Sequence, residues 1–284
     1  MKVVTSPVEM QSLALDLRGL GRTIGLVPTM GWFHEGHLSL MRKAKEVSEL
    51  VITSLFVNPL QFGPLEDLKS YPYDLERDKE LAAGVGVDVL YAPDKKLMYS
   101  GAFATNVHVE RLTEGLCGAA RPGHFDGVTT VVAKLFNQTL PHFAVFGQKD
   151  FQQLAVIKRM VRDLDFPIEI IGQPIIREAS GLAMSSRNSY LKDEDQEAAL
   201  SLSRGIAHAK ELAENSSIPV EKIKISVRRF IEKHRECEVD YIEIVNATSL
   251  KACDSINSES IILIAVKINN YIRLIDNSTL LPSS

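Results

Sequence analysis

Apolar runs and amphipathic stretches alternate along the first third of the chain. Apolar runs at residues 23–27, 50–57 and 87–91 predict strands, and the continuous β-rich run at 50–57 predicts a strand that is buried on both faces. The stretches at 35–50 and 74–83 carry apolar residues at helical spacing. This order of strands and helices is typical of a doubly wound parallel α/β sheet.

A helix is also predicted near the N-terminus, at 6–17, where Ser6 is the capping residue and Pro7 takes the first helical position.

The pattern of strands and helices continues in the middle of the chain with less regularity. Further on we expect a short β run at 106–109, a mobile Gly-rich polar loop at 116–127 and a helix at 128–139. These are followed by a strand at 143–146, a second helix at 151–164 and a last strand in two pieces, at 166–171 and 174–176.

The character of the sequence changes after Tyr190. Two amphipathic helices, at 193–214 and 220–234, are joined by a polar linker at 215–219. Three short apolar runs follow, at 239–245, 260–266 and 271–275. We therefore predict a Rossmann-like doubly wound domain over residues 1–176 and a smaller α+β domain over residues 177–284.

The segment from Ile24 to Leu40 carries the first candidate chemistry. Its strand runs to Pro28, and a glycine-containing loop then leads into a helix near Glu35. Such a loop directs backbone N–H groups and the positive end of the helix dipole at an anion. His34 and His37 flank this helix start in the pattern His-Glu-Gly-His. Alternatively, the two histidines only cap the helix; a zinc site needs a different spacing, as in His-Glu-x-x-His.

Two later loops repeat this chemistry. The apolar run at 143–146 leads into Gly147-Gln148-Lys149-Asp150 and a helix, so that the Lys149 ammonium could meet a phosphate and Asp150 could cap the helix. The segment 183–188 combines hydroxyl groups with Arg187, which suits a polyphosphate. Each of these loops could equally be an ordinary solvated turn.

The composition narrows the class of partner. The chain has 284 residues, 45% of them hydrophobic, and a formal net charge of −4, which gives no electrostatic case for nucleic acid or an anionic membrane. No signal-peptide or membrane-spanning run is present in the sequence, and three widely spaced cysteines argue against a disulfide framework. We expect a cytoplasmic location.

Four motifs in order resemble the pantothenate synthetase (pantoate–β-alanine ligase) family of the nucleotidylyltransferase superfamily. They are Pro28-Thr29-Met30-Gly31 with His34-Glu35-Gly36-His37, Phe56-Val57-Asn58-Pro59-Leu60-Gln61-Phe62, Phe146-Gly147-Gln148-Lys149-Asp150-Phe151-Gln152-Gln153, and Met184-Ser185-Ser186-Arg187-Asn188. The resemblance implies ligation of pantoate and β-alanine through a pantoyl adenylate, with release of pyrophosphate and then AMP. It also implies a homodimer.

The resemblance also assigns roles to residues. It places ATP on Met30, Gly31, Trp32, Phe33, His34, Glu35, Gly36, His37, Gly147, Gln148, Lys149, Asp150, Ile176, Met184, Ser185, Ser186 and Arg187. Of these, it gives catalytic roles at the phosphates to His34, His37, Lys149, Ser185, Ser186 and Arg187. Gln61 would bind both pantoate and β-alanine, and Gln153 would bind pantoate.

Magnesium is the cofactor that the resemblance implies, with Asp78 as the nearest matching ligand and Asp74 and Glu76 as alternatives. Two other functions stay open. A nucleotidylyltransferase with a different acceptor would share the histidine motif but would not need the two glutamines. A non-enzymatic nucleotide-binding module would explain the phosphate loops but not the two histidines together with the hydroxyl-rich loop.

Overall fold

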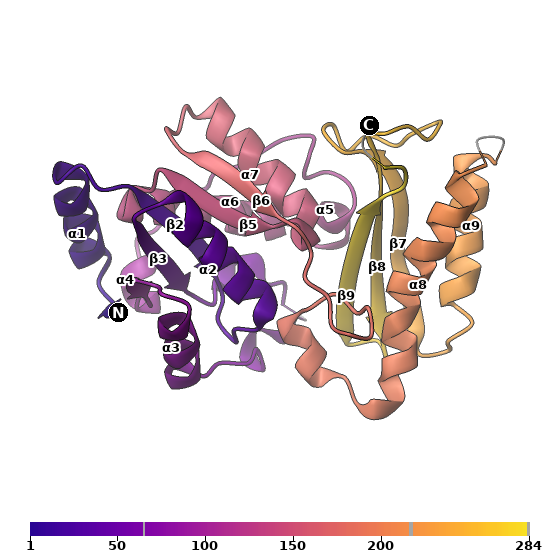
Figure 1. The fold of residues 1–284 in the computed structure, drawn as a ribbon, viewed down its shortest axis with the longest axis horizontal. Coiled ribbons are helices and arrows are strands. Elements are labelled where there is room, and N and C mark those ends of the chain that lie inside the picture. The colour runs from indigo at the N-terminus through magenta and orange to yellow at the C-terminus, as the bar shows by residue number, and fades with distance from the viewer. Residues whose placement is uncertain (65, 216–217, 283–284) are drawn as a thin grey trace. The chain divides into compact units, whose positions relative to one another are not determined.

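The chain folds into two compact units, which are described separately (Figure 1). The computed structural model describes residues 1–64, 66–215 and 218–282. The first unit comprises residues 1–114, 121–148 and 153–174, and the second comprises residues 115–120, 149–152 and 175–284. None of the helices in the described ranges has the length and apolar composition needed to cross a membrane.

A parallel sheet forms the centre of the first unit. Within the described residues it has six strands in the order β1-β4-β3-β2-β5-β6. Their bounds are β1 (Lys2–Val4), β2 (Ile24–Thr29), β3 (Leu50–Leu55), β4 (Val89–Tyr91), β5 (Phe143–Gly147) and β6 (Glu169–Gln173). The doubly wound, Rossmann-like fold predicted from the sequence is therefore confirmed.

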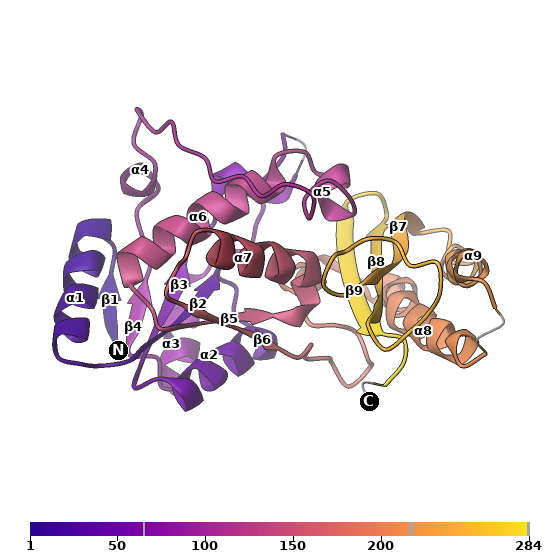
Figure 2. The ribbon, with the colours of Figure 1, turned by 90° about the horizontal axis from the view of Figure 1, so that it is seen from above.

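Helices cover both faces of this sheet. Figure 2 shows α2 (Glu35–Val47) and α3 (Leu75–Gly84) on one face, and α1 (Pro7–Gly19), α6 (His124–Thr139) and α7 (Phe151–Asp163) on the other. A short helix, α4 (Lys95–Met98), follows β4.

The apolar stripe of α2 anchors that helix to the sheet. Its fully buried Met41 and Ala44 pack in one cluster with Val27 of β2 and Val51 of β3. Burying a side chain such as Met contributes roughly 1.5–3 kcal/mol. This packing fixes the start of α2, and with it the His-Glu-Gly-His segment, beside the end of β2.

The second unit is built on an antiparallel sheet in the order β7-β8-β9, with β7 (Cys237–Asn246), β8 (Ser260–Ile268) and β9 (Ile272–Thr279). One face of this sheet packs on α8 (Gln196–Ala213) and α9 (Val220–Ile231), in a core that includes the fully buried Val227 and Ile264. On the other face, Leu116 and Phe151 pack against Ile261 and Leu263. These contacts explain why two short segments from earlier in the chain belong to this unit.

Several element bounds differ from the prediction. Strand β2 continues through Pro28 to Thr29, because its pairing with β5 covers Gly25 and Leu26 and the missing N–H of proline falls beyond it. Helix α2 ends at Val47, where Ser48 follows with extended backbone and its hydroxyl donates to the carbonyl of Ala44.

The middle of the chain shows the largest differences between the predicted and the observed elements. The β run expected at 106–109 is not a strand, because the Val107 amide and carbonyl hydrogen-bond to the side chains of Thr130 and Thr129 on α6. The loop expected at 116–127 contains the short helix α5 (Cys117–Ala120) and the first turn of α6. Residues 174–176 lie outside β6, and the linker expected at 215–219 falls partly outside the described residues. The predicted domain boundary after residue 176 stays a prediction.

Candidate active site

The site begins at the edge of the parallel sheet where three neighbouring strands end. Strand β2 pairs with β3 on one side and with β5 on the other, so Thr29, Leu55 and Gly147 end their strands at the same edge. Ligands of open α/β sheets bind at this edge. The first unit therefore brings the histidine loop, the turn that carries Gln61, and the Gly147–Gln148 segment to one side of the sheet.

His34 and His37 both cap helix α2. The Nδ1 atom of His34 accepts a hydrogen bond from the Gly36 amide at 3.1 Å, and Nδ1 of His37 receives a longer one from the His34 amide at 3.4 Å. The two rings lie with their centroids 4.1 Å apart. The capping role considered for these histidines is therefore part of the structure.

The caps also fix the tautomers of the two rings. An Nδ1 that accepts from an amide carries no proton, so each neutral ring has its proton on Nε2. Each imidazole therefore keeps an N–H donor on the side of the ring away from the cap. Capping and the binding of a phosphate oxygen are compatible, because they use different nitrogens.

Asp78, the expected magnesium ligand, does not fit that role. Its side chain is fully buried, and its two oxygens accept hydrogen bonds from the amides of Trp32 at 2.6 Å and Phe33 at 2.7 Å. Burial, the largest effect, raises the pKa of this carboxyl although both amides and Arg77 act to lower it. A metal ion would have to reach a fully buried carboxylate whose two oxygens each already accept from a main-chain amide.

The alternative carboxylates on α3 are also committed to structural contacts. Asp74 caps the helix by accepting from the Arg77 amide, and the exposed Glu76 pairs with Lys79. No cluster of three or more His, Cys, Asp or Glu side chains suited to a metal ion is found in the described part of the chain.

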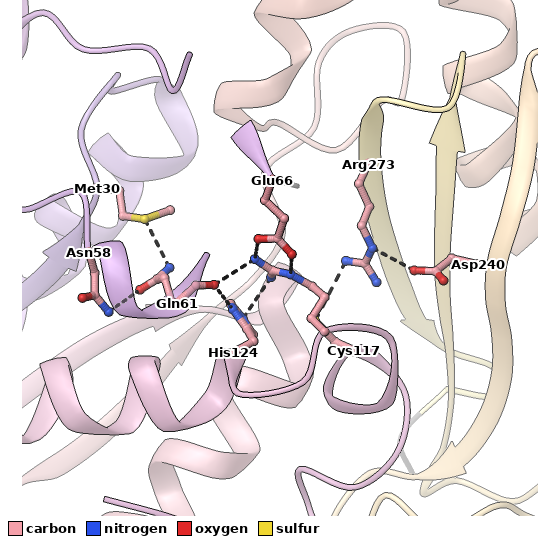
Figure 3. A network of polar contacts seen from close by, with 9 residues as sticks. Met30, Asn58, Gln61, Glu66, Cys117, His124, Asp240 and Arg273 are labelled. Atoms are coloured by element: carbon pink, nitrogen blue, oxygen red, sulfur yellow. Dashed lines mark hydrogen bonds and ion pairs between the residues drawn. The ribbon is translucent and has the colours of Figure 1, made fainter. Parts of the chain in front are cut away.

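Gln61 lies beside the histidine loop. Its amide nitrogen is 3.2 Å from the sulfur of Met30, the first residue after β2, and its side-chain oxygen accepts from Asn58 Nδ2 at 3.1 Å (Figure 3). Asn58 is almost fully buried, and its carboxamide also contacts Tyr99 and the Gly127 carbonyl. The side chain of Gln61 is therefore held from two sides.

A second network holds the backbone of Gln61 (Figure 3). Its carbonyl oxygen accepts from Arg121 Nη2 at 3.1 Å and lies 2.8 Å from His124 Nδ1. Arg121 also forms a two-pronged ion pair with Glu66. Burial is the largest effect on the pKa of Glu66 and raises it, but Arg121 and the Gly63 amide together hold that pKa below its ordinary value. Glu66 thus stays ionised and orients the arginine.

The other predicted site residues of the first unit follow strand β5. Gly147 ends the strand, Gln148 lies next to Gly172 of β6, and Gln153 lies in the first turn of α7. The second unit contains Lys149 and Asp150, in a 3₁₀ turn whose Lys149 carbonyl accepts from Asn277 Nδ2 of β9 at 2.9 Å.

The second unit also positions the hydroxyl-rich segment. The Met184 amide donates to the Ile176 carbonyl at 2.9 Å, which closes a hairpin at 176–184. Arg177, next in the hairpin, forms a bidentate ion pair with the buried Asp276 of β9 at 2.7 and 2.8 Å. Ser185 caps the following turn by accepting from the Arg187 amide, and Ser186 is buried. The sequence-predicted ATP residues thus divide into one set in each unit.

Sequence reasoning gave no positioning role to Asn58, Glu66, Arg121 or His124. The signal for Asn58 was its place between a buried strand and Pro59, where a side-chain amide can close the turn. No local signal marks the other three, because Glu66 and Arg121 meet across 55 positions of sequence.

Comparisons with known proteins show which family this chain resembles. The family model for pantoate–β-alanine ligase matches residues 2–279. A pantothenate synthetase from Heliobacterium modesticaldum is 51% identical over 277 residues, 98% of each chain, and one from Geobacter sulfurreducens is 48% identical over 280 residues, 99% of each chain.

Solved structures of the same family share the fold. A pantothenate synthetase from Thermus thermophilus has a TM-score of 0.93 at 42% identity, covering 99% of this chain and 100% of its own. The pantoate–β-alanine ligase of Francisella tularensis, in complex with β-γ ATP and β-alanine, has a TM-score of 0.82 at 33% identity and full coverage of both chains. With a family model that spans nearly all of its residues, this chain belongs to the pantoate–β-alanine ligase family.

Proposed function

We propose that this ATP-dependent ligase works in two steps, with the carboxyl edge of the parallel sheet holding the reacting groups. In the first step a pantoate carboxylate oxygen attacks the α-phosphorus of ATP, and the bond to the β-phosphate breaks to release pyrophosphate. In the second step the amine of β-alanine attacks the acyl carbon of pantoyl adenylate, loses a proton and displaces AMP. The first step is needed because a free carboxylate has no good leaving group.

The observation that carries this proposal is the contact between Gln61 and Met30. Gln61 is the residue proposed to hold the small acid, and Met30 begins the loop proposed to hold ATP. A pantoate bound at Gln61 would thus lie next to the nucleotide loop. Holding two reactants in contact supplies much of the rate in reactions of this kind.

The histidine loop is proposed to bind the phosphates. The Nε2–H groups of His34 and His37 are donors near the positive end of the α2 dipole, and they would stabilise the charge that develops as pyrophosphate leaves. Both histidines act as neutral donors in this proposal. No side chain has to form a covalent intermediate.

The second unit is proposed to complete the ATP site. Lys149 and Arg187 would meet the phosphates, and Ser185 and Ser186 would donate hydroxyl hydrogen bonds to them. Gly147, Gln148, Asp150, Ile176 and Met184 would contact the rest of the nucleotide. Gln153 would help Gln61 to hold pantoate.

Magnesium stays part of the proposal as the ion that accompanies ATP, since Mg²⁺ in such sites keeps several waters and binds largely through substrate phosphates. No step is assigned to it here, because the carboxylate expected to bind it is engaged with the Trp32 and Phe33 amides. A homodimer and a cytoplasmic location are likewise proposals.

The test is to separate the two steps. The protein is incubated with ATP, Mg²⁺ and pantoate without β-alanine, and pyrophosphate and acyl adenylate are measured; β-alanine is then added, and AMP and the amide are measured. We expect about one pyrophosphate per active site before β-alanine, and AMP only afterwards. Release of AMP without pantoate, or adenylation of an unrelated acid in preference to it, would contradict the proposal.

A further inference from the structure

The turn between β2 and α2 has a backbone that its sequence does not favour. Gly31 and Trp32 both have positive φ, at 91° and 53°. Glycine adopts this region easily, but a tryptophan there is uncommon. Such a conformation persists only where surrounding groups hold it in place. His34 follows Trp32 by two positions, so the conformation of this turn determines where the histidine loop begins.

Asp78 of α3 supplies the first part of that hold. Its Oδ2 accepts from the Trp32 amide and its Oδ1 from the Phe33 amide, at 2.6 and 2.7 Å, inside the buried core of the first unit. Hydrogen bonds from amides to an ionised carboxylate are shorter and stronger than those to a neutral acceptor. A Cβ placed on Gly31 would lie 3.1 Å from Oδ2, so the turn fits closely over the carboxylate.

Arg77 supplies the second part. Its Nη2 donates to the Phe33 carbonyl at 2.8 Å, and its guanidinium lies 4.8 Å from the centre of the Trp32 ring. Its Nη1 contacts Asp78 at 3.2 Å. The two adjacent residues therefore hold the amides, a carbonyl and the aromatic ring of the same turn.

We propose that Asp78, assisted by Arg77, is a positioning residue that sets the conformation of the ATP loop rather than a ligand of magnesium. The inference rests on the proposed ATP-binding role of residues 30–37. If the turn at Trp32 relaxes, the helix start and the two histidine donors shift relative to the sheet edge, while the Gln61 network stays in place. The loss should then fall on the use of ATP rather than of pantoate.

The test uses Asp78→Asn, which keeps the shape of the side chain but directs an NH₂ group at one of the two amides. We expect kcat/KM for ATP to fall by about 10- to 100-fold, the size of effect that misplaced reacting groups produce. The KM for pantoate and the Mg²⁺ concentration giving half-maximal activity should stay within about twofold of wild type. Hydrogen exchange of the free enzyme should speed up at residues 31–36.

Glu80→Gln is the matched control, because Glu80 is an exposed acid on the same helix and has no proposed role in binding ATP or Mg²⁺. If Asp78→Asn needs much more Mg²⁺ and excess Mg²⁺ restores its rate, Asp78 is a metal ligand and the proposal is wrong. If the variant loses thermal stability but keeps kcat/KM for ATP below its melting temperature, the role is structural only, which also overturns the proposal.

Arg77→Met keeps the proposal testable if Asp78→Asn does not fold. It removes the contacts to the Phe33 carbonyl and the Trp32 ring but leaves the carboxylate in place, and Arg77 is partly exposed. We expect a smaller loss, about threefold to tenfold, in kcat/KM for ATP. An unchanged value would contradict the proposal. Failure of the wild-type protein to release pyrophosphate would count against the proposed function instead.

Discussion

His34 and His37 each cap helix α2 with one ring nitrogen and present a hydrogen-bond donor on the other. In His34 and His37, Nδ1 accepts from a helix-end amide, which leaves the proton on Nε2. The ring is thus oriented by the helix that it caps. A flexible donor would lose conformational entropy on meeting a phosphate, whereas these rings have already lost it on folding.

The first prediction at this scale concerns His37. Replacing His37 with Ala should reduce adenylate formation about 10²- to 10³-fold, the usual effect of removing one donor that stabilises developing charge. The measurement is pre-steady-state pyrophosphate release with ATP and pantoate. His108→Ala is the control, because His108 is an exposed histidine that pairs with Asp126. A folded His37→Ala variant with wild-type pyrophosphate release would exclude the proposed role.

The second prediction concerns the two glutamines. Gln61→Ala and Gln153→Ala should each weaken pantoate binding by about 1–3 kcal/mol, the cost of leaving a buried polar partner without its hydrogen bond. ATP binding should change much less, and titration calorimetry with each ligand measures both. Gln11→Ala on α1, whose side chain is exposed, is the matched control. Equal losses for both ligands would point to general damage to the site.

At the scale of elements, one helix sets the position of the Gln61 turn. A Cβ built on Gly127 of α6 would lie 2.4 Å from the carbonyl carbon and oxygen of Leu60 and 2.6 Å from the Gln61 amide nitrogen. The backbone of α6 therefore packs directly against the turn. Arg121 and His124, just before and at the start of the same helix, complete the hold on Gln61.

Gly127→Ala should therefore act on pantoate use. The new methyl group must push the backbone of the turn away, because no flexible side chain is there to yield, and overpacking of this kind costs about 1–3 kcal/mol. We expect a lower melting temperature and a raised KM for pantoate. Gly84→Ala is the control, since a Cβ there meets nothing within 4 Å. If Gly127→Ala keeps the wild-type KM, the close packing does not position Gln61.

How far the sequence predicts each element depends on whether the signal is local. The strands β2, β3 and β5 and helix α2 follow from continuous apolar runs and helical spacing, and their expected bounds differ by a few residues at most. The segment 106–109 has the composition of a strand, but its backbone groups bond to threonine side chains of α6. That outcome depends on residues more than twenty positions away.

The same reasoning applies to the site. The histidine motif was found because it follows a predicted strand, and Gln61 was found because its motif resembles that of the family. The contacts that orient them were not, because Asp78 reaches Trp32 and Phe33 across 46 and 45 positions, and Arg121 reaches Gln61 across 60. Asp78 is the instructive case: the family resemblance suggests a magnesium ligand at this position, but only the fold shows that its two oxygens accept hydrogen bonds from the Trp32 and Phe33 amides.

At the scale of the whole molecule, the proposed ATP residues are shared by the two units. Residues 30–37 and 147–148 belong to the first, whereas 149–150, 176 and 184–187 belong to the second. Units connected in this way are expected to move relative to each other unless their interface is large and apolar. Such motion would exclude water from the reactive acyl adenylate until the amine of β-alanine binds.

The last prediction is that residues 177–284 act as a lid that carries Arg187 to the phosphates. Hydrogen exchange should show residues 183–188 becoming protected when ATP, Mg²⁺ and pantoate are added, together with residues 30–37. ATP alone should protect the two segments less, because water has to be excluded only once the adenylate forms. Arg187→Gln should abolish the protection at 183–188 and leave that at 30–37 largely intact, since the segments belong to different units. If residues 183–188 are already as protected in the free enzyme as in the complex, they form a fixed wall of the site and the lid does not exist.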